Sequence, residues 1–473
     1  MAFKHIDAIE VLLYGEKVGV VAAERRASNS YAFEYYPGWI EQGVSISPLH
    51  LPLKPGAQVF RGLSKETWYG LPPAIADALP DHFGNSLINA HLAQKGVVAA
   101  EITPLDRLAY VADRAMGALE FRPALSFGRE PGGILDVAEL VMAARDAVRG
   151  SFSDDKESKK ALQSLLSVGV SAGGARAKAV VNIDPKTKEL TAGHRQIAGK
   201  ESWIIKFDGV GRDAGLGETQ QYGRIEYAYS LMARDAGIDS PETRLLEENG
   251  RAHFMIRRFD RIDDAQSGDD AQSVDDAESV DGTESVDGTE SVDDTESRGS
   301  GGVGAPASNA QRKLHLQSLC AMDCVDYNLL HTNEYASLLA VISRLGLGDE
   351  AKTEAFRRAA FNHMAANCDD HSKNFSFLMD QNGVWRLAPA YDITFAHNSQ
   401  NIWLREHLMG IDGKFSGVAY EELFKFADAH SIPYARQVLK KIKSVLSHWP
   451  DYAKQAGVSA EAASSIQQVF QKQ

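Results

Sequence analysis

The sequence has few cysteines, no long apolar run and no secretory leader pattern, and each absence excludes a class of protein. Three cysteines in 473 residues are sparse and odd in number, which argues against a disulfide framework and fits a reducing compartment. No stretch approaches the roughly 18 consecutive apolar residues of a membrane helix. Met1–Tyr14 mixes charged with apolar residues, unlike a signal peptide. We therefore expect a cytoplasmic protein with no membrane partner.

The formal net charge of −14 comes from one segment. Asp263–Ser297 holds fourteen acidic residues and no basic one, and without it the acidic and the basic residues both number 50. The rest of the chain therefore lacks the basic excess that is typical of proteins binding nucleic acid on their own.

This acidic segment is a hexapeptide repeat that runs from Ala265 to Ser300. Each of its six hexads has at most one Val to bury, too little apolar surface to offset the entropy of ordering the chain. A calcium-binding repeat is the alternative, but the Gly and Glu positions of an EF-hand are missing. We expect a disordered linker over residues 263–310.

The apolar pattern differs on the two sides of this linker. Before it, alternating apolar residues predict strands such as Ile9–Leu13 and Glu16–Ala22, with helices between them, including Tyr222–Gly237. After it, helical periodicity begins at Leu314–Met322 and continues to Ala460–Phe470. We expect an α+β protein with a strand-rich N-terminal lobe and a mainly helical C-terminal lobe, the architecture of a two-lobed protein kinase.

One strand pair is predicted in the helical half, and it marks the candidate active site. Phe375–Met379 and Val384–Leu387 flank an Asn-Gly turn, a strong hairpin signal. Just before it, Asp369 and Asn374 have the spacing of the kinase residues that accept the hydroxyl proton and hold magnesium. After it, Asp392 stands where kinases place a second metal ligand.

Each of these residues could instead cap a turn or a helix, but three in this order around a hairpin favour phosphoryl transfer. Asp370 lies one residue off the expected spacing and remains the rival base.

The residues that would bind the phosphates of a nucleotide are predicted earlier in the chain, before the linker. The apolar strand Ser202–Phe207 carries Lys206, and Glu226 follows twenty residues later in a helix. A strand Lys paired with a helix Glu is how kinases hold the α and β phosphates. The alternatives are an edge-strand lysine and a solvated glutamate.

A glycine-rich stretch, Gly169–Lys178, precedes this strand. Its glycines would let backbone N–H groups approach a phosphate closely. It is neither a Walker A loop nor a G-x-G-x-x-G motif, and a plain flexible connection is the alternative.

Together these stretches resemble the HipA family of serine/threonine kinases, the toxins of bacterial toxin–antitoxin systems. The resemblance is carried by five stretches: VGVSAGGARAKAVV (168–181), SWIIKF (202–207), RRFDR (257–261), NCDDHSKNFSFL (367–378) and LAPAYDI (387–393). The N-terminal VLLYGEKVGVV (11–21) and SPLHLPL (47–53) are also similar to the family's first subdomain. The resemblance covers nearly the whole chain except the acidic linker.

The resemblance implies a kinase-like fold that uses ATP and Mg²⁺. It implies a family-like subdomain over residues 1–125, an ATP-binding part over 126–262 and a catalytic lobe over 311–473. Asp369 would be the base, with Lys206 as a further catalytic residue, and Asn374 and Asp392 would hold the metal. The implied nucleotide contacts are Ser171, Ala172, Gly173, Gly174, Lys178, Lys206, Glu226, Arg257, Phe259, His371, Asn374 and Tyr391.

Two further properties follow from the resemblance. Ser171 falls where some members carry an autophosphorylated serine, and a phosphate there would repel ATP. The implied partners are a protein substrate, with translation components as family targets, and a small helix-turn-helix antitoxin that would provide any contact with DNA. Asp370 departs from members that have a small residue at this position. A small-molecule kinase and an inactive, DNA-associated regulator are the alternative functions.

Overall fold

The computed structural model describes residues 3–24, 30–127, 134–149, 156–168, 176–193, 197–210, 221–262 and 312–470. It has two compact units: Met1–Arg261 with Lys313–Gln473, and Ile262–Arg312. The predicted linker, 263–310, lies outside the described residues. The chain leaves the larger unit at β11 (Arg261–Ile262) and returns to it at β12 (Arg312–Lys313).

The first sheet of the larger unit has the strand order β4-β3-β2-β1-β5. Its strands are β1 (Ala8–Leu13), β2 (Glu16–Ala23), β3 (Tyr31–Tyr35), β4 (Gln58–Val59) and β5 (Leu119–Arg122). The predicted first two strands are confirmed, and they pair as an antiparallel hairpin from Leu13↔Glu16. Alternate residues of β1 (Ile9, Val11 and Leu13) are fully buried, as expected for a strand that turns one face to a core. Leu12, on the other face, is also buried, so both faces are covered at the end of this strand.

Short helices accompany this sheet in the sequence: α1 (Pro37–Gln42), α2 (Lys65–Trp68), α3 (Pro73–Ala76), α4 (His82–Ala93), η1 (Ala99–Glu101) and α5 (Pro104–Val111). Polar side chains start several of them. Asp81 caps α4 by accepting a hydrogen bond from the Gly84 backbone N–H, and Thr103 caps α5 in the same way.

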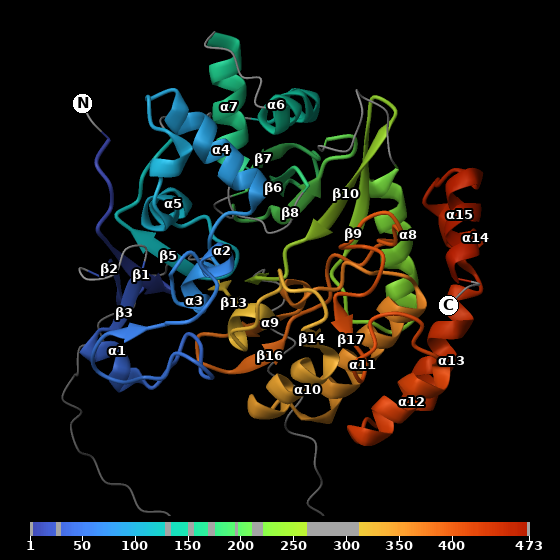
Figure 1. Ribbon diagram of the computed structural model, residues 1–473. Coiled ribbons are helices and arrows are strands. Elements are labelled where there is room, and N and C mark those ends of the chain that lie inside the picture. Colours follow the sequence, from blue (N-terminus) through green and yellow to red (C-terminus); the bar gives the residue numbers. More distant parts are fainter. Residues whose placement is uncertain are drawn as a thin grey trace, which may run out of the picture. The chain divides into compact units, whose positions relative to one another are not determined.

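The second sheet has the order β7-β6-β8-β10-β9 (Figure 1). Its strands are β6 (Lys178–Ile183), β7 (Leu190–Ala192), β8 (Glu201–Lys206), β9 (Thr243–Glu248) and β10 (Arg251–Arg257), and the helices α6 (Val137–Arg149), α7 (Lys156–Val168) and α8 (Tyr222–Asp235) occur in the same region of the chain. Helix α8 crosses β10 at Gly223, where a Cβ atom would lie 2.1 Å from the Ala252 carbonyl oxygen. Only glycine allows this close approach.

The C-terminal region is mainly helical, as predicted. Its helices are α9 (Leu319–Met322), α10 (Tyr335–Arg344), α11 (Gly348–Met364), η2 (Ser372–Asn374), α12 (Tyr420–Ala429), α13 (Ala435–Leu446), α14 (Trp449–Gln455) and α15 (Ala460–Phe470). The predicted hairpin is present as β15 (Ser376–Met379) and β16 (Trp385–Leu387).

The prediction of a helix over Leu314–Met322 is wrong in its first half. β13 (His315–Ser318) pairs with β15, and only α9 is helical. Tertiary pairing overrides the local pattern here, because the buried backbone of β13 obtains its hydrogen bonds from β15. A further parallel pair, β14 (Asn333–Glu334) with β17 (Met409–Gly410), was also not predicted.

Two hydrophobic cores lie within the larger unit. The first contains the N-terminal sheet and residues of β6 and β8, such as Ile205. The second contains the C-terminal helices and also the apolar face of α8, including Tyr229. The Tyr229 hydroxyl donates a hydrogen bond to the Ala365 carbonyl oxygen at 2.7 Å, which ties α8 to the region after α11. Helix α8 therefore precedes the linker in sequence but packs with the C-terminal helices.

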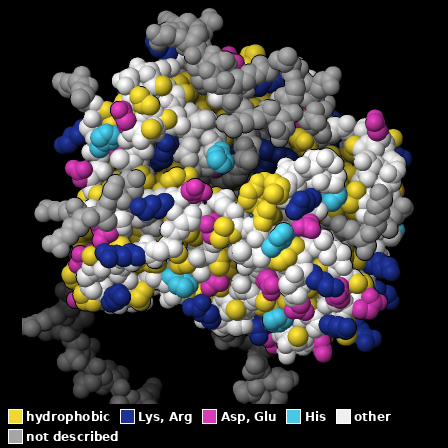
Figure 2. Space-filling view, in the orientation of Figure 1, with side chains coloured by type: hydrophobic (Ala, Val, Ile, Leu, Met, Phe, Trp, Pro, Cys, Tyr) yellow, Lys and Arg dark blue, Asp and Glu magenta, His cyan; other side chains and the backbone are white. Residues whose placement is uncertain are grey.

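Acidic and basic side chains are intermixed on the face shown in Figure 2, in line with the balanced charge outside the acidic repeat. Within the described ranges, no helix is both long enough and apolar enough to cross a membrane.

The RRFDR stretch contains a buried ionic cluster around Asp260, which has no exposed surface. Its carboxylate accepts hydrogen bonds from Arg258 (2.9 and 2.7 Å), Arg261 (2.7 Å) and the Gly117 backbone N–H (2.6 Å). Burial alone would raise the pKa of Asp260, but the two guanidinium groups hold it well below its usual range. The cluster joins the segment after β10 to the residues just before β5.

Replacing Asp260 with Ala leaves two buried guanidinium groups without their shared partner. We expect this change to lower the free energy of unfolding by about 3–5 kcal/mol, measured by urea denaturation. The exposed Asp412→Asn variant is the control and should change it by less than about 0.5 kcal/mol. Equal stability of the two variants would contradict the role assigned to Asp260.

Candidate active site

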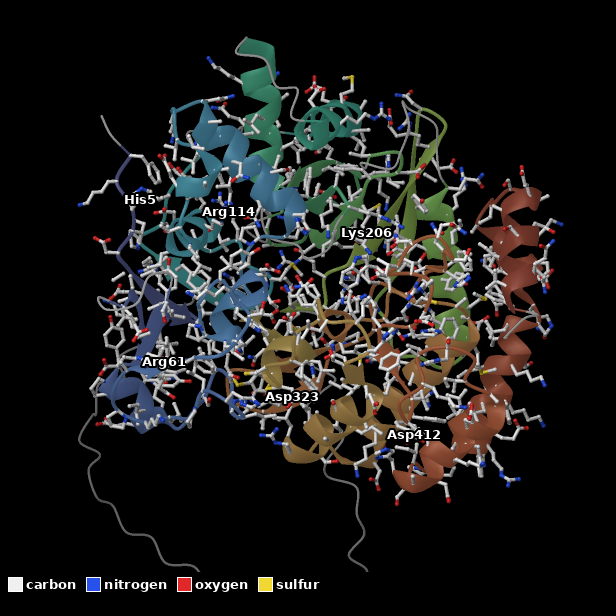
Figure 3. All side chains as sticks on the ribbon, in the orientation of Figure 1. His5, Arg61, Arg114, Lys206, Asp323 and Asp412 are labelled. Atoms are coloured by element: carbon white, nitrogen blue, oxygen red, sulfur yellow. The ribbon has the colours of Figure 1, made fainter. Side chains whose placement is uncertain are left out.

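Lys206 is at the centre of the site, at the end of β8 (labelled in Figure 3). Its Nζ lies 2.5 Å from Glu226 Oε1 and forms a second ion pair with the Asp392 carboxylate. Only 13% of the Lys206 side chain is exposed. Burial would lower the pKa of Lys206, but Asp392 and Glu226 raise it overall, so the ammonium stays charged. The expected pairing of the strand lysine with the helix glutamate is present.

Glu226 is buried on α8 and holds two cations. Besides Lys206 it pairs with Arg176, whose Nη1 lies 3.2 Å from Glu226 Oε2. The Arg176 guanidinium also lies over the Tyr222 ring, 4.5 Å from its centroid. Arg176 lies near the end of the glycine-rich stretch, so Glu226 connects the end of that stretch to Lys206.

The predicted phosphate loop itself is not described. Ser171, Ala172, Gly173 and Gly174 lie outside the described residues. Lys178, the first residue of β6, is described, and it forms a buried ion pair at 3.2 Å with Asp81 from the start of α4.

The two adjacent aspartates have different surroundings. The side chain of Asp369 is 49% exposed, and His371 Nε2 lies 3.8 Å from its carboxylate. Asp370 is 1% exposed. Desolvation raises the pKa of Asp369, and the nearby Asp392 and Asp370 charges add to this effect. A partly exposed carboxylate with a raised pKa can accept a proton from a bound hydroxyl group.

Asp370 differs, because both of its carboxylate oxygens accept hydrogen bonds from other groups of the protein. Oδ2 accepts hydrogen bonds from the Tyr335 hydroxyl (2.8 Å) and His407 Nδ1 (2.9 Å), and Oδ1 accepts them from the Leu408 (2.8 Å) and Met409 (3.3 Å) backbone N–H groups. Burial would lower the pKa of His407, but Asp370 raises it to about 10. Asp370 and His407 therefore form a buried ion pair, and Asp370 also ties the segment 369–374 to β17 through the Met409 backbone N–H.

Asn374 and Asp392 supply the oxygen donors that magnesium prefers. The Asn374 amide donates a 2.7 Å hydrogen bond to the Asp369 carbonyl oxygen, which leaves its own side-chain oxygen as an acceptor. Both residues line the same small cavity beside α11. Asp392 has a left-handed backbone conformation (φ 55°), which aspartate tolerates better than most residues. The donor set fits one Mg²⁺ completed by phosphate oxygens and water.

Of the two residues expected near adenine, Phe259 contacts the segment that carries Asp392. The Phe259 ring stacks on Tyr391 with centroids 5.7 Å apart, and the Tyr391 hydroxyl donates a 2.8 Å hydrogen bond to the Lys373 carbonyl oxygen. Arg257, at the end of β10, forms longer ion pairs with Glu242 (3.5 Å) and Glu201 (3.9 Å).

Sequence reasoning missed several residues that support the site. Arg176 was part of the glycine-rich stretch but had no assigned role, although a cation beside a phosphate loop is a usable signal. No sequence pattern indicated the roles of His407 and Asp81, because these residues lie far along the chain from the residues they contact.

Two family models match the chain. A family model described as the HipA-like C-terminal domain matches residues 170–472, and one described as the HipA N-terminal domain matches residues 9–122. No curated protein sequence matches the chain significantly.

Two solved structures are similar to the chain. HipA of Shewanella oneidensis MR-1, solved with HipB and operator DNA, is 15% identical over 98% of this chain and 95% of that chain, with a TM-score of 0.59, which shows a shared fold. The Helicobacter pylori proinflammatory kinase CtkA is 12% identical over 57% of this chain and 86% of that chain. Its TM-score of 0.33 is too low to indicate a shared fold.

The different surroundings of the two aspartates predict different effects on stability. Asp370→Asn removes one partner of the buried pair with His407, so we expect it to lower the free energy of unfolding by about 3–5 kcal/mol. Asp369→Asn removes a charge that burial disfavours, so we expect unchanged or slightly higher stability. Chemical denaturation at pH 7 measures both, and a larger loss in Asp369→Asn would reverse the assignment.

Proposed function

Because the chain belongs to the HipA family, whose model covers more than half of it, we propose that it is an ATP-dependent kinase that phosphorylates serine or threonine in a protein. The proposal rests mainly on two ion pairs of Lys206, one with Glu226 and one with Asp392. These contacts bring the phosphate-binding lysine beside the metal-binding carboxylate, as in-line transfer of the γ-phosphoryl group requires.

In this proposal each residue has one task. Lys206 binds phosphate oxygens, and Glu226 orients its ammonium. Asn374 and Asp392 would hold Mg²⁺, and the bound ion would neutralise the charge that develops on the phosphate oxygens. Asp369 accepts the proton of the attacking hydroxyl group.

Phe259 stacks on Tyr391, which places an aromatic ring beside the Asp392 segment, and we propose that Phe259 and Arg257 flank adenine. His371, 3.8 Å from Asp369, is a further proposed nucleotide contact. Asp370 is proposed to anchor the catalytic segment rather than to act as the base, because both of its oxygens are already hydrogen-bonded.

We further propose that the protein is a growth-inhibiting toxin with a small antitoxin partner. The support is the shared fold with the Shewanella HipA, which was solved with HipB and operator DNA. Any contact of this chain with DNA would then depend on the antitoxin.

Replacing Asp369 with Asn should lower the rate of phosphoryl transfer by a factor of about 10²–10⁴, because a positioned base contributes about that much. The measurement is transfer of label from γ-labelled ATP to proteins of a cell lysate, with a pool of small metabolites as the parallel acceptor. Asp412→Asn is the exposed control. An unchanged rate in Asp369→Asn would remove this residue as the base, and label found only in metabolites would favour a small-molecule kinase.

Ser171 is proposed as a site of self-inactivation, because it falls where some members of the HipA family carry an autophosphorylated serine. Incubation with Mg-ATP should add one phosphate to the wild type and none to Ser171→Ala, as seen by intact-mass and peptide mass spectrometry. The phosphorylated form should also lose ATP affinity, since the added charge of about −1.5 to −2 repels the nucleotide. Absence of phosphate on Ser171 in the wild type would contradict the proposal.

A further inference from the structure

A short segment of the N-terminal domain reaches the candidate nucleotide site. Asp77 and Asp81 lie at the two ends of this segment, which connects α3 to α4 within the range matched by the HipA N-terminal domain model. Both aspartates are largely buried, with side chains 8% and 7% exposed. A buried carboxylate requires a cation or several hydrogen bonds, so the partners of each indicate its role.

Asp81 pairs with a lysine of the second sheet. Its Oδ2 lies 3.2 Å from Nζ of Lys178, whose side chain is 3% exposed. Lys178 is the register partner of Lys206 on β8, and directly opposite residues of antiparallel strands project from the same face. The two ammonium groups therefore belong to one face of the sheet.

The charge of Lys178 also acts on the proposed metal ligand. Burial raises the pKa of Asp392, but Lys206 and then Lys178 lower it, and the net shift is downward. Each of the two lysines at this face has its own acidic partner outside the second sheet: Glu226 for Lys206 and Asp81 for Lys178.

Asp77 binds the other half of the site. Its carboxylate accepts hydrogen bonds from the Ser318 backbone N–H (2.7 Å) and hydroxyl (2.8 Å) at the start of α9. Its Oδ1 also lies 3.9 Å from Nζ of Lys373, in the segment between Asp369 and Asn374. The five-residue segment 77–81 thus contacts both the first residue of β6 and the segment between Asp369 and Asn374.

We propose that Asp81 is a positioning residue for ATP: it holds the Lys178 ammonium where it contacts the nucleotide phosphates, while Asp77 fixes the same segment to the catalytic side. The N-terminal domain thereby becomes part of the nucleotide site. This inference rests on the proposed kinase function. Without Asp81, the buried ammonium of Lys178 loses this carboxylate, and we expect it to shift from the phosphate position, since removing one partner of a buried ion pair is costly.

The test is the affinity of the full-length Asp81→Asn variant for ATP and for adenosine, measured by calorimetry with Mg²⁺. Asn remains a good N-cap, so α4 keeps its cap. ATP should bind about tenfold more weakly than to the wild type, a difference of about 1.4 kcal/mol, whereas adenosine, which has no phosphate, should bind equally well. In a Lys178→Met background, Asp81→Asn should have no further effect on ATP binding.

Asp106→Asn is the matched control. Asp106 is a fully buried carboxylate of the same domain that binds His5 and the Ile6 and Thr103 backbone N–H groups. This control should reproduce any general loss of stability but leave ATP affinity unchanged.

The outcomes separate this inference from the proposed function. If the wild type binds no ATP, the proposed function fails. If the wild type binds ATP and Asp81→Asn binds it equally well, the pair with Lys178 is only structural. Tighter binding by Asp81→Asn would mean that Asp81 competes with phosphate for Lys178, and this result would also overturn the inference.

Discussion

The site depends on one buried cation. Lys206 extends from a strand of the first hydrophobic core, whereas its two partners, Glu226 and Asp392, belong to helix α8 and the segment after β16, which pack with the second core. A buried ammonium is tolerated only when it is well paired, so the two cores are held in the arrangement that provides both carboxylates. The same contacts bring the proposed phosphate-binding lysine and the proposed metal ligand Asp392 together.

A second constraint determines which aspartate is available for chemistry. Asp370 is fixed by Tyr335, His407 and two backbone N–H groups, and this network leaves its neighbour Asp369 partly exposed. A reactive group needs rigid support from residues that do not react, because small displacements cost much of the rate. The adjacent pair thus divides into an anchor, Asp370, and a partly exposed carboxylate, Asp369, which is the proposed base.

Sequence patterns identified what is local in the chain. The spacing of Asp369 and Asn374 and the Asn-Gly hairpin could be read directly, and Lys206 with Glu226 required only a strand followed by a helix. Contacts over long separations gave no pattern: His407 lies 37 residues from Asp370, and Asp81 is in a different domain from Lys178. The β13 error has the same origin, since its pairing with β15 depends on residues about 60 positions away.

The most direct measurement is a calorimetric titration of the full-length protein with ATP, in Mg²⁺ and again in excess chelator. Because Asn374 and Asp392 are proposed to hold the metal between the protein and the phosphates, we predict one ATP per chain with Mg²⁺ and at least tenfold weaker binding without it, about 1.4 kcal/mol or more. No binding, or equal affinity with and without Mg²⁺, would contradict a phosphoryl-transfer site built around Lys206 and Asp392.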